Sequence, residues 1–394
     1  MSNLEEALEL DRRWSMVSRR SLFELPAGLI YLDGNPLGPP LRGLADNVGA
    51  AVREWSTHLI SGWFGTDGRD GWVGLPERVG SRLEPILGAA PGSVVACDST
   101  TVNLFKAVQA ACDLRPGDLL TDSGNFPTNL YALAGIAHSR GRRLVVVEPE
   151  SIENAIDSSV GVVSVTQVDF RSGRLHDLGS ITQRVHEAGG VAVWDLSHTA
   201  GAMPIDLASN DVDLAVGCGY KYLNGGPGAP AYMYVRPDLV AEVRNPIAGW
   251  FGHRRPFDFS PEFLPDDGVG RMRVGTPHIL SLVALDAALE VFADLDLADL
   301  RAASQSLTGF FIELLDRELG SLLEIITPRD SDLRGSQVSI RLPRADKLIE
   351  SLAAAGVTGD FRNPDVARFG FSALFNTHEE VVRAVSEISA ALGR

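Results

Sequence analysis

The chain has 394 residues, of which 45% are hydrophobic and 22% charged, and its formal net charge is −16 at pH 7. These proportions are typical of a folded globular protein, and the length predicts a large domain with a smaller one beside it. A chain this acidic lacks the cations that nucleic-acid phosphates and anionic membranes require, so we expect no nucleic acid and no membrane among its partners.

The three cysteines, Cys97, Cys112 and Cys218, form neither a disulfide framework nor the paired spacing of a metal site. The first residues, "MSNLEEALELDRRW", are charged where a secretory signal would be apolar. No apolar run reaches the roughly 20 residues that cross a bilayer. We therefore expect a cytoplasmic protein without a metal.

Residues 1–60 predict an N-terminal helical segment that packs with the small domain. Ser2 and Glu5 have the spacing of a capping box, which predicts a first helix. "YLDGNPLGPP" predicts a short strand followed by a Gly/Pro turn. Apolar residues recur at three- and four-residue spacing over 41–59, which predicts an amphipathic helix.

Residues 61–270 predict the large domain. Short apolar strands alternate there with helices, which indicates an α/β fold whose mostly parallel sheet is covered on both faces. The predicted strands are 93–97, 143–149, 160–168, 190–196, 212–219 and 229–235, and the predicted helices include 104–113, 129–140 and 181–189.

Residues 271–394 predict a smaller α+β domain. Two long helices are expected over 277–295 and 299–319, and a third helix from about 344. Strands are expected at 335–342 and 366–372. Thr377 and Glu380 could form the capping box of a last helix.

An aspartate and a lysine lie near the carboxyl ends of two predicted strands, where parallel sheets bind their ligands. Asp195 lies at the end of the strand 190–196, and Lys221 follows the strand 212–219. Ligands of such sheets bind beyond the carboxyl ends of the strands, so both side chains would reach one crevice. A buried lysine is a Schiff-base nucleophile, and an aspartate can face the pyridinium nitrogen of pyridoxal phosphate (PLP). The alternative, a surface lysine and a capping aspartate, is disfavoured by the flanking apolar strands and the following "NGGPG".

These residues resemble the kynureninase family of PLP-dependent, fold-type-I enzymes in the aminotransferase-like superfamily. The most specific motif is "GCGYKYLNGGPGAP", which follows "WDLSHTAGAMPIDL". Similar segments occur in the family's order over most of the chain: "YLDGNPLGPP", "DSTTVNLFKAV", "NFPTNLYALAG", "GWFGH", "RGSQVSI" and "ARFGFSALFNTHEEV". The resemblance implies a PLP fold-type-I large domain with a mostly parallel sheet and a smaller α+β C-terminal domain.

The resemblance also implies roles for the matched residues. Lys221 would bind PLP covalently and move the substrate's α proton, Asp195 would face the pyridine nitrogen, and Phe126 would stack on the ring. Thr276, in "RVGTPHI", would come from the partner subunit of a homodimer with shared active sites. Arg368 would hold the α-carboxylate of an amino-acid substrate. The other implied cofactor contacts are Thr100 and Thr101 at the phosphate, Tyr220 and Trp250 near it, and Thr128, Asn129, Thr166 and His198.

Simpler structural roles stay open for three of these residues. Phe126 could be plain core, His198 a satisfied core histidine, and Arg368 a surface ion-pair residue. The chain also departs from the family pattern in three places. Asn129 stands where the family usually has aspartate, Pro36 replaces the serine of "GNSLG", and "SGWFGTDGRDGW" lacks the polar residues expected around the aromatic-substrate pocket.

The resemblance implies hydrolysis of L-kynurenine, or of a ring-substituted kynurenine such as 3-hydroxykynurenine, to an anthranilate and L-alanine. A second hypothesis is a PLP-dependent β-lyase or desulfurase acting on another amino acid. None of the cysteines lies in an obvious glycine-rich lid, which counts against a persulfide carrier. A third hypothesis is a binding protein that has lost activity, and the retention of Lys221 and Asp195 argues against it.

Overall fold

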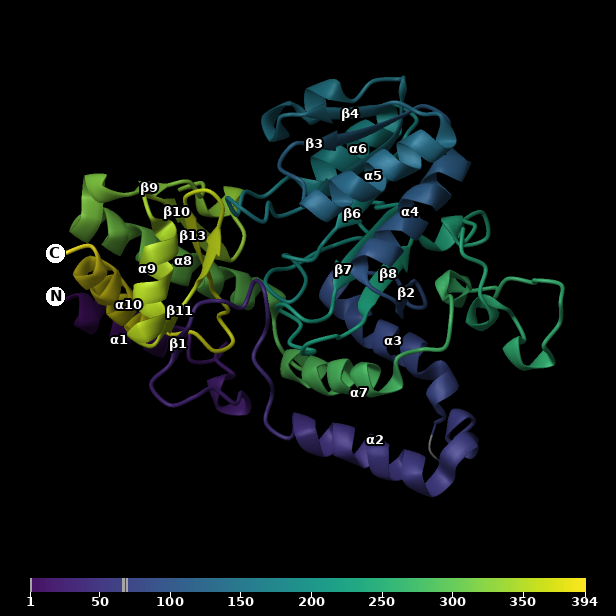
Figure 1. Cartoon of the computed structure of the whole chain (residues 1–394), viewed down its shortest axis with the longest axis horizontal. Coiled ribbons are helices and arrows are strands. Elements are labelled where there is room, and N and C mark those ends of the chain that lie inside the picture. Colours follow the sequence, from purple (N-terminus) through teal and green to yellow (C-terminus); the bar gives the residue numbers. More distant parts are fainter. Residues whose placement is uncertain (1, 66–67, 69) are drawn as a thin grey trace.

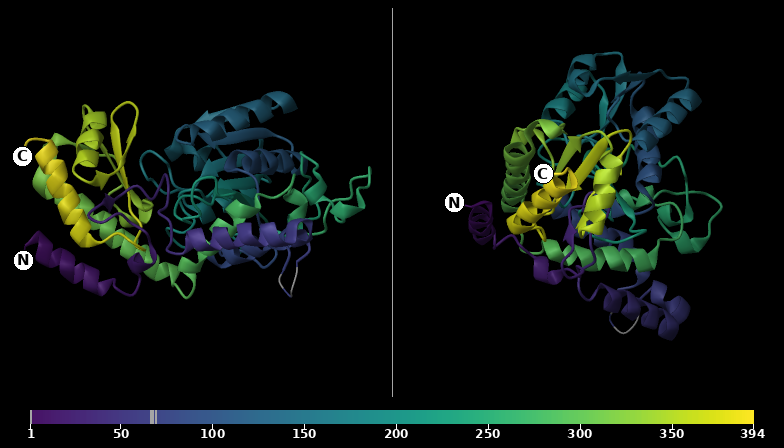
Figure 2. Two further views of the ribbon diagram at one scale, coloured as in Figure 1. Left: turned by 60° about the horizontal axis from the view of Figure 1, so that its bottom comes forward. Right: turned by 60° about the vertical axis from the view of Figure 1, so that its left-hand side comes forward.

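The computed structural model describes residues 2–65, 68 and 70–394, and it places two β-sheets at opposite ends of the molecule (Figure 1). A seven-stranded sheet forms the larger part, and a four-stranded sheet lies near the C-terminus. Both chain termini lie beside the smaller sheet (Figure 2). Part of the segment 61–72, one of the departures from the family pattern, lies outside the described residues.

The seven-stranded sheet has the spatial order β2-β8-β7-β6-β5-β3-β4. Neighbouring strands from β4 to β7 are parallel, and β8 is antiparallel to both of its neighbours. The carboxyl ends of the parallel strands therefore share one edge. In chain order the strands are β2 (Val94–Ala96), β3 (Asp118–Asp122), β4 (Leu144–Val147), β5 (Val160–Thr166), β6 (Val191–Asp195), β7 (Leu214–Cys218) and β8 (Ala231–Val235).

Helices cover both faces of this sheet, because its strands are apolar on both sides. Within β6, Val191 and Val193 belong to one core, while Ala192 and Trp194 belong to the other. The first core includes residues of α4 (Thr100–Leu114) and α5 (Pro127–Arg140). The second includes residues of α3 (Leu75–Leu87), α6 (Leu178–Glu187) and α7 (Ile279–Ala288).

The smaller sheet is antiparallel, with the order β12-β13-β10-β9. Its register places Asp360 directly opposite Arg368. The strands are β9 (Glu324–Ile325), β10 (Gln337–Arg341), β12 (Asp360–Arg362) and β13 (Val366–Gly370), and the accompanying helices are α8 (Leu297–Leu319), α9 (Ala345–Ala354) and α10 (His378–Ala391).

The N-terminal segment touches both parts of the molecule. Helix α1 (Asn3–Arg13) packs against α10, whereas α2 (Leu44–His58) lies along α7 (Figure 1). Between them, β1 (Ile30–Tyr31) pairs in parallel with β11 (Val357–Thr358). In this way the segment bridges the two sheets.

The predicted fold class is confirmed, and so are both capping boxes, at Ser2–Glu5 and Thr377–Glu380. The expected helix 277–295 is shorter, because α7 ends at Ala288 and a single 3-10 turn, Leu289–Phe292, follows it. The short strands β3, β9, β11 and β12 were not predicted. Among the described residues, no helix is long and apolar enough to cross a membrane.

The "GNPLG" turn after β1 lies directly against the chain at Lys221. The Gly38 amide donates a hydrogen bond to the Tyr220 carbonyl at 2.9 Å. A Cβ atom on Gly38 would stand 2.3 Å from the Lys221 carbonyl oxygen and 2.3 Å from Asn224 Oδ1. Only glycine allows this close approach, so the turn fixes the backbone that carries Lys221.

We predict that Gly38→Ala lowers the stability of the protein by about 1–3 kcal/mol, the usual cost of forcing a methyl group into a packed site. The Lys221 backbone has to shift, so activity should fall as well. Thermal unfolding and turnover of the purified variant measure the two effects. Gly28→Ala is the control, since nothing lies within 4 Å of a Cβ there although its φ of +80° adds local strain. Wild-type activity in Gly38→Ala would show that the turn does not position Lys221.

Candidate active site

Lys221 and His198 meet beyond the carboxyl ends of β7 and β6. Lys221 Nζ lies 2.9 Å from His198 Nε2, in a turn where the lysine is half-buried. Burial lowers the pKa of His198 well below its usual range, and the nearby positive charge of Lys221 adds to this effect. The imidazole is therefore neutral and Nε2 accepts the hydrogen bond. Its Nδ1 is buried and has no partner among the described residues, so it remains available to a ligand.

Asp195 ends β6 as a buried carboxylate with three hydrogen bonds. Oδ1 accepts from the Ser197 amide at 2.9 Å and from the Ser197 hydroxyl at 2.6 Å. Oδ2 accepts from Asn129 Nδ2 at 2.8 Å. A buried charge requires such donors. The contact joins Asp195 to Asn129, two residues that were each expected to face the cofactor.

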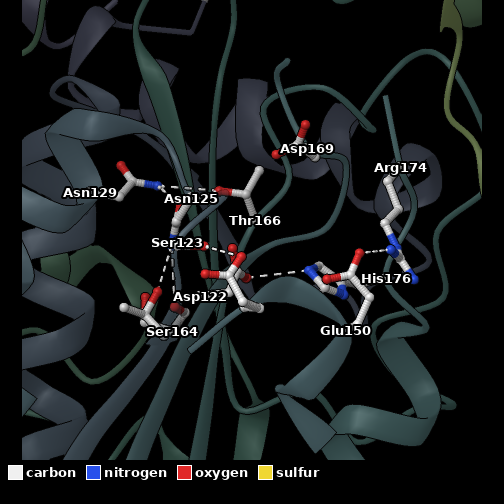
Figure 3. A network of polar contacts seen from close by, with 12 residues as sticks. Asp122, Ser123, Asn125, Asn129, Glu150, Ser164, Thr166, Asp169, Arg174 and His176 are labelled. Carbon is white, nitrogen blue, oxygen red and sulfur yellow. Dashed lines mark hydrogen bonds and ion pairs between the residues drawn. The ribbon is translucent and has the colours of Figure 1, made fainter. Parts of the chain in front are cut away.

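Asn125 connects this carboxylate to the rest of the sheet edge. Its Oδ1 accepts from Thr166 Oγ1 at 2.6 Å and from Asn129 Nδ2 at 3.0 Å (Figure 3). The same oxygen accepts from the Phe126 backbone amide at 2.8 Å, and Asn125 Nδ2 donates to Thr121 Oγ1 at 3.0 Å. Asn125, which was not predicted as a site residue, thus brings Thr166 and Asn129 together.

Phe126 and Thr128 lie at the start of α5. Phe126 is the N-cap residue and is 41% exposed, so it is not plain core. Its ring meets that of Phe170 edge to face at 5.1 Å between centroids. Thr128 is half-buried in the first turn of the helix. An exposed aromatic face at the sheet edge suits a flat ligand.

Thr100 and Thr101 open α4, as expected from the sequence. Ser99 is the N-cap, and the backbone amides of such a first turn attract anions. Behind this turn lies Lys106, which is fully buried. Its ammonium donates to Asp98 Oδ2 and to the Met272 carbonyl, both at 2.6 Å, and so ties the turn to the segment that leads to Thr276.

Three of the expected contacts lie around the edges of this region. Tyr220 is half-buried beside Lys221, whose Nζ lies 5.8 Å from the centre of the tyrosine ring. Burial raises the pKa of Tyr220 above its usual range, so the phenol stays protonated. Trp250 contacts Phe251, Phe257 and Phe259, and Thr276 is exposed in the wall of an apolar groove beside α2.

Arg368 is only 1% exposed, so it is not a surface ion-pair residue. Its Nε donates to Asp360 Oδ1 at 2.6 Å, and its Nη2 donates to Asp360 Oδ2. Nη1 donates to the Phe170 carbonyl of the larger part of the molecule. Arg368 was expected to hold the substrate carboxylate, but one pair of its parallel donors is already bound by Asp360.

Four polar or charged residues of this region were not predicted from the sequence: Asn125, Ser197, Asp360 and Arg362. Asn125 and Ser197 lie within the motifs "NFPTN" and "WDLSH" and could have been proposed from their positions next to Phe126 and Asp195. Asp360 and Arg362 alternate along "GDFRN", which is the spacing of one face of a strand. With the strand unpredicted, that signal was not visible.

Comparisons with known proteins show the family of this chain. A family model described as the kynureninase C-terminal domain matches residues 300–388. The kynureninase of Deinococcus radiodurans is 45% identical over 388 residues, which cover 97% of this chain and 95% of that protein. The chain belongs to the kynureninase family. A kynureninase of Pseudomonas fluorescens is 41% identical over 405 residues, covering 100% of this chain and 96% of that protein.

Solved structures with the same fold include enzymes of sulfur chemistry. A cysteine desulfurase from Thermococcus onnurineus superposes with a TM-score of 0.81 at 17% identity, covering 94% of this chain and 96% of that one. The cystine C–S lyase C-DES, solved with cysteine persulfide, gives 0.80 at 16% identity, covering 92% and 98%. At these identities the likeness shows the fold alone, which is the fold predicted from the sequence.

Asn129 offers a test of the electrostatics at Asp195. In Asn129→Asp two carboxylates would meet at the 2.8 Å contact, and they would share a proton, because two adjacent buried anions repel each other. The folded variant then binds a proton that the unfolded chain has released near neutral pH. Its stability therefore falls as the pH rises.

We predict that Asn129→Asp is roughly 1–3 kcal/mol less stable than the wild type at pH 8, the scale of a lost buried hydrogen bond, and closer to it at pH 5. Thermal melts at both pH values measure this difference. Asn129→Ala, which removes the donor without adding a charge, should show a much weaker pH dependence. Equal destabilisation of Asn129→Asp at both pH values would contradict the shared proton.

Proposed function

We propose that this protein is a PLP-dependent kynureninase that hydrolyses L-kynurenine, or a ring-substituted kynurenine, to an anthranilate and L-alanine. The observation that carries the proposal is the meeting of Lys221, His198 and Asp195 at one sheet edge, in a chain 45% identical over nearly its whole length to a kynureninase. Such an enzyme belongs to tryptophan catabolism.

The residues of the site fit PLP. Lys221 offers a half-buried amine and Asp195 a buried carboxylate, while His198 Nδ1 is a buried polar atom with no partner among the described residues. The amides that open α4 suit a phosphate. When bound, PLP withdraws electrons from the α-carbon of an amino acid and so weakens the bonds to that carbon.

Each side chain then has a task that follows from its position. Lys221 would hold the cofactor through its ε-amine and carry the substrate's α proton, and His198 accepts a hydrogen bond from that amine. Asp195 would keep the pyridine nitrogen protonated, and the exposed face of Phe126 would cover the ring. The remaining proposed contacts are Thr100 and Thr101 at the phosphate, Tyr220 and Trp250 near it, and Thr128, Asn129 and Thr166 at the ring.

The alternative desulfurase activity lacks a carrier residue. Desulfurases use an exposed, mobile cysteine to accept the sulfur atom. Cys97, Cys112 and Cys218 are free thiols and all three are buried. Burial also raises the pKa of Cys97 to about 11, which disfavours the reactive thiolate. Kynurenine hydrolysis needs no such thiol.

Three unpaired cysteines also suit the reducing cytoplasm that we propose as the protein's location.

A homodimer with shared sites is part of the proposal. An apolar groove of about 350 Å³ runs between α2 and the segment 276–280. Its wall includes Trp55 and Ile60, which are 55% and 75% exposed. An apolar surface of this kind is a usual mark of a protein interface. A second copy in the groove would cover these side chains and would leave Thr276 beside the partner, where the family resemblance puts it.

Incubation of the purified protein and PLP with L-kynurenine and with 3-hydroxykynurenine tests the activity, by anthranilate fluorescence and alanine release. Lys221→Ala should lose about 10³-fold or more in turnover, because no other group can both attach the cofactor and move the proton. The variant should also release PLP on gel filtration. Normal turnover by Lys221→Ala would refute the cofactor assignment. No reaction with either kynurenine, together with release of sulfide from added cysteine or cystine, would favour a lyase or desulfurase.

Arg368→Lys keeps the positive charge but loses the planar donors, so we predict a raised KM and a lowered kcat for kynurenine, roughly 10- to 100-fold together in kcat/KM. Steady-state kinetics measure both constants. Kynuramine, which lacks the carboxylate, should react poorly with the wild type. Unchanged kcat/KM in Arg368→Lys would mean that the carboxylate is held elsewhere.

A further inference from the structure

Four charged side chains gather where β1, β12 and β13 meet. Asp360 and Arg362 lie on β12, Arg368 lies opposite on β13, and Asp33 follows β1. The backbone of Asp33 forms an isolated parallel β-bridge with Gly370, which lies two residues beyond Arg368. Neither Asp33, Asp360 nor Arg362 has a part in the activity described above.

Asp360 is the centre of this group. One carboxylate accepts from both guanidinium groups: Oδ1 and Oδ2 face Nε and Nη2 of Arg368, and Oδ2 also lies 2.7 Å from Arg362 Nη2. The Asp360 side chain is 14% exposed, so few waters compete for these contacts. Such a paired arrangement fixes the plane of a guanidinium.

The group has an excess of positive charge. Burial raises the pKa of Asp33 to about 7, and the neighbouring Asp360 carboxylate adds to this rise. Asp33 is therefore partly protonated at neutral pH, and its remaining charge together with that of Asp360 does not fully balance the two guanidinium groups. The other ionisable groups that sense this cluster are His198, which is neutral, and the phenols Tyr31 and Tyr222, whose pKa values are raised. A substrate carboxylate would complete the charge balance.

Donors remain for such a carboxylate. A guanidinium has five N–H groups, and the three hydrogen bonds of Arg368 leave one on each terminal nitrogen. Arg362 is 35% exposed and bonds to Asp360 and to its own strand's Phe361 carbonyl, so it also keeps free donors. Two N–H groups are what one carboxylate accepts in a paired contact.

We propose that Asp360 is a positioning residue for the substrate carboxylate, holding Arg368 and Arg362 so that their remaining N–H groups form one anion site. The inference rests on the proposed kynureninase activity and adds to it a second guanidinium and the carboxylate that orients both. Asp360 itself does not touch the substrate. Its removal would leave the cations in place but free to turn.

Asp360→Asn tests this role by comparing its effect on two ligands, one with the carboxylate and one without it. We expect the KM for kynurenine to rise at least 10-fold, while the inhibition constant of kynuramine, which has no carboxylate, changes less than threefold. In the Arg368→Lys background the same substitution should add little, because the two changes act on one site. Asp365→Asn, on the turn after β12, is the matched control. Asp365 forms an ion pair with the exposed Arg341, outside this cluster, so the substitution should leave both constants unchanged.

Asp360→Glu guards against a variant that does not fold, because it keeps the charge and moves it by one methylene; its KM should rise by a smaller factor. Equal weakening of kynurenine and kynuramine binding, or an unchanged KM in either variant, would overturn the positioning role. A wild type that turns over no kynurenine at all would instead refute the proposed function, so the two failures are distinguishable.

Discussion

The buried carboxylate of Asp195 needs hydrogen-bond donors, and the surrounding chain is arranged to supply them. A charge in a protein interior is stable only where donors replace the water it has lost. Ser197 supplies two such donors from the same turn, and Asn129 supplies a third from α5. Asn129 in turn depends on Asn125, and Asn125 on Thr166 of β5. The charge at the end of β6 is thus connected by hydrogen bonds to the start of α5 and to the end of β5. The position of Lys221 relative to these elements follows from the order of strands in the sheet.

Much of this arrangement could be predicted from the sequence, because its physical causes are local. The strand β6 reads as an apolar run with a carboxylate at its end, and both capping boxes are visible as residue spacings. Parallel strands share an edge, so placing Asp195 and Lys221 together needed only the order of strands and helices. The motif around Lys221 then identified the family.

The parts that escaped prediction depend on contacts between distant segments. Strand β12 has three residues, of which only Phe361 is apolar, and its existence is decided by pairing with β13. The pairing of Asp360 with Arg368 could therefore not be predicted, and the paired donors of the arginine were expected to be free for the substrate. Gly38 poses the same problem, since the need for glycine arises from the Lys221 carbonyl more than 180 residues away in the chain. Spacing in a sequence carries no information about such encounters.

The carbonyl of Phe170 is one of several hydrogen-bonding contacts that join the two halves of the molecule, together with those between Leu175 and Leu333 and between Tyr222 and Ser336. It accepts from Arg368 and, at 3.1 Å, from Gln337 Nε2, both on the smaller sheet, while the ring of the same residue leans on Phe126. Separating the two halves here would leave two buried donors, Arg368 and Gln337, without an acceptor. The cost in stability would be about 1–3 kcal/mol for each donor, and more for the charged arginine. Phe170 thus couples two residues of the proposed site: a shift of the small sheet relative to the large one would act on Arg368 through the carbonyl and on Phe126 through the ring.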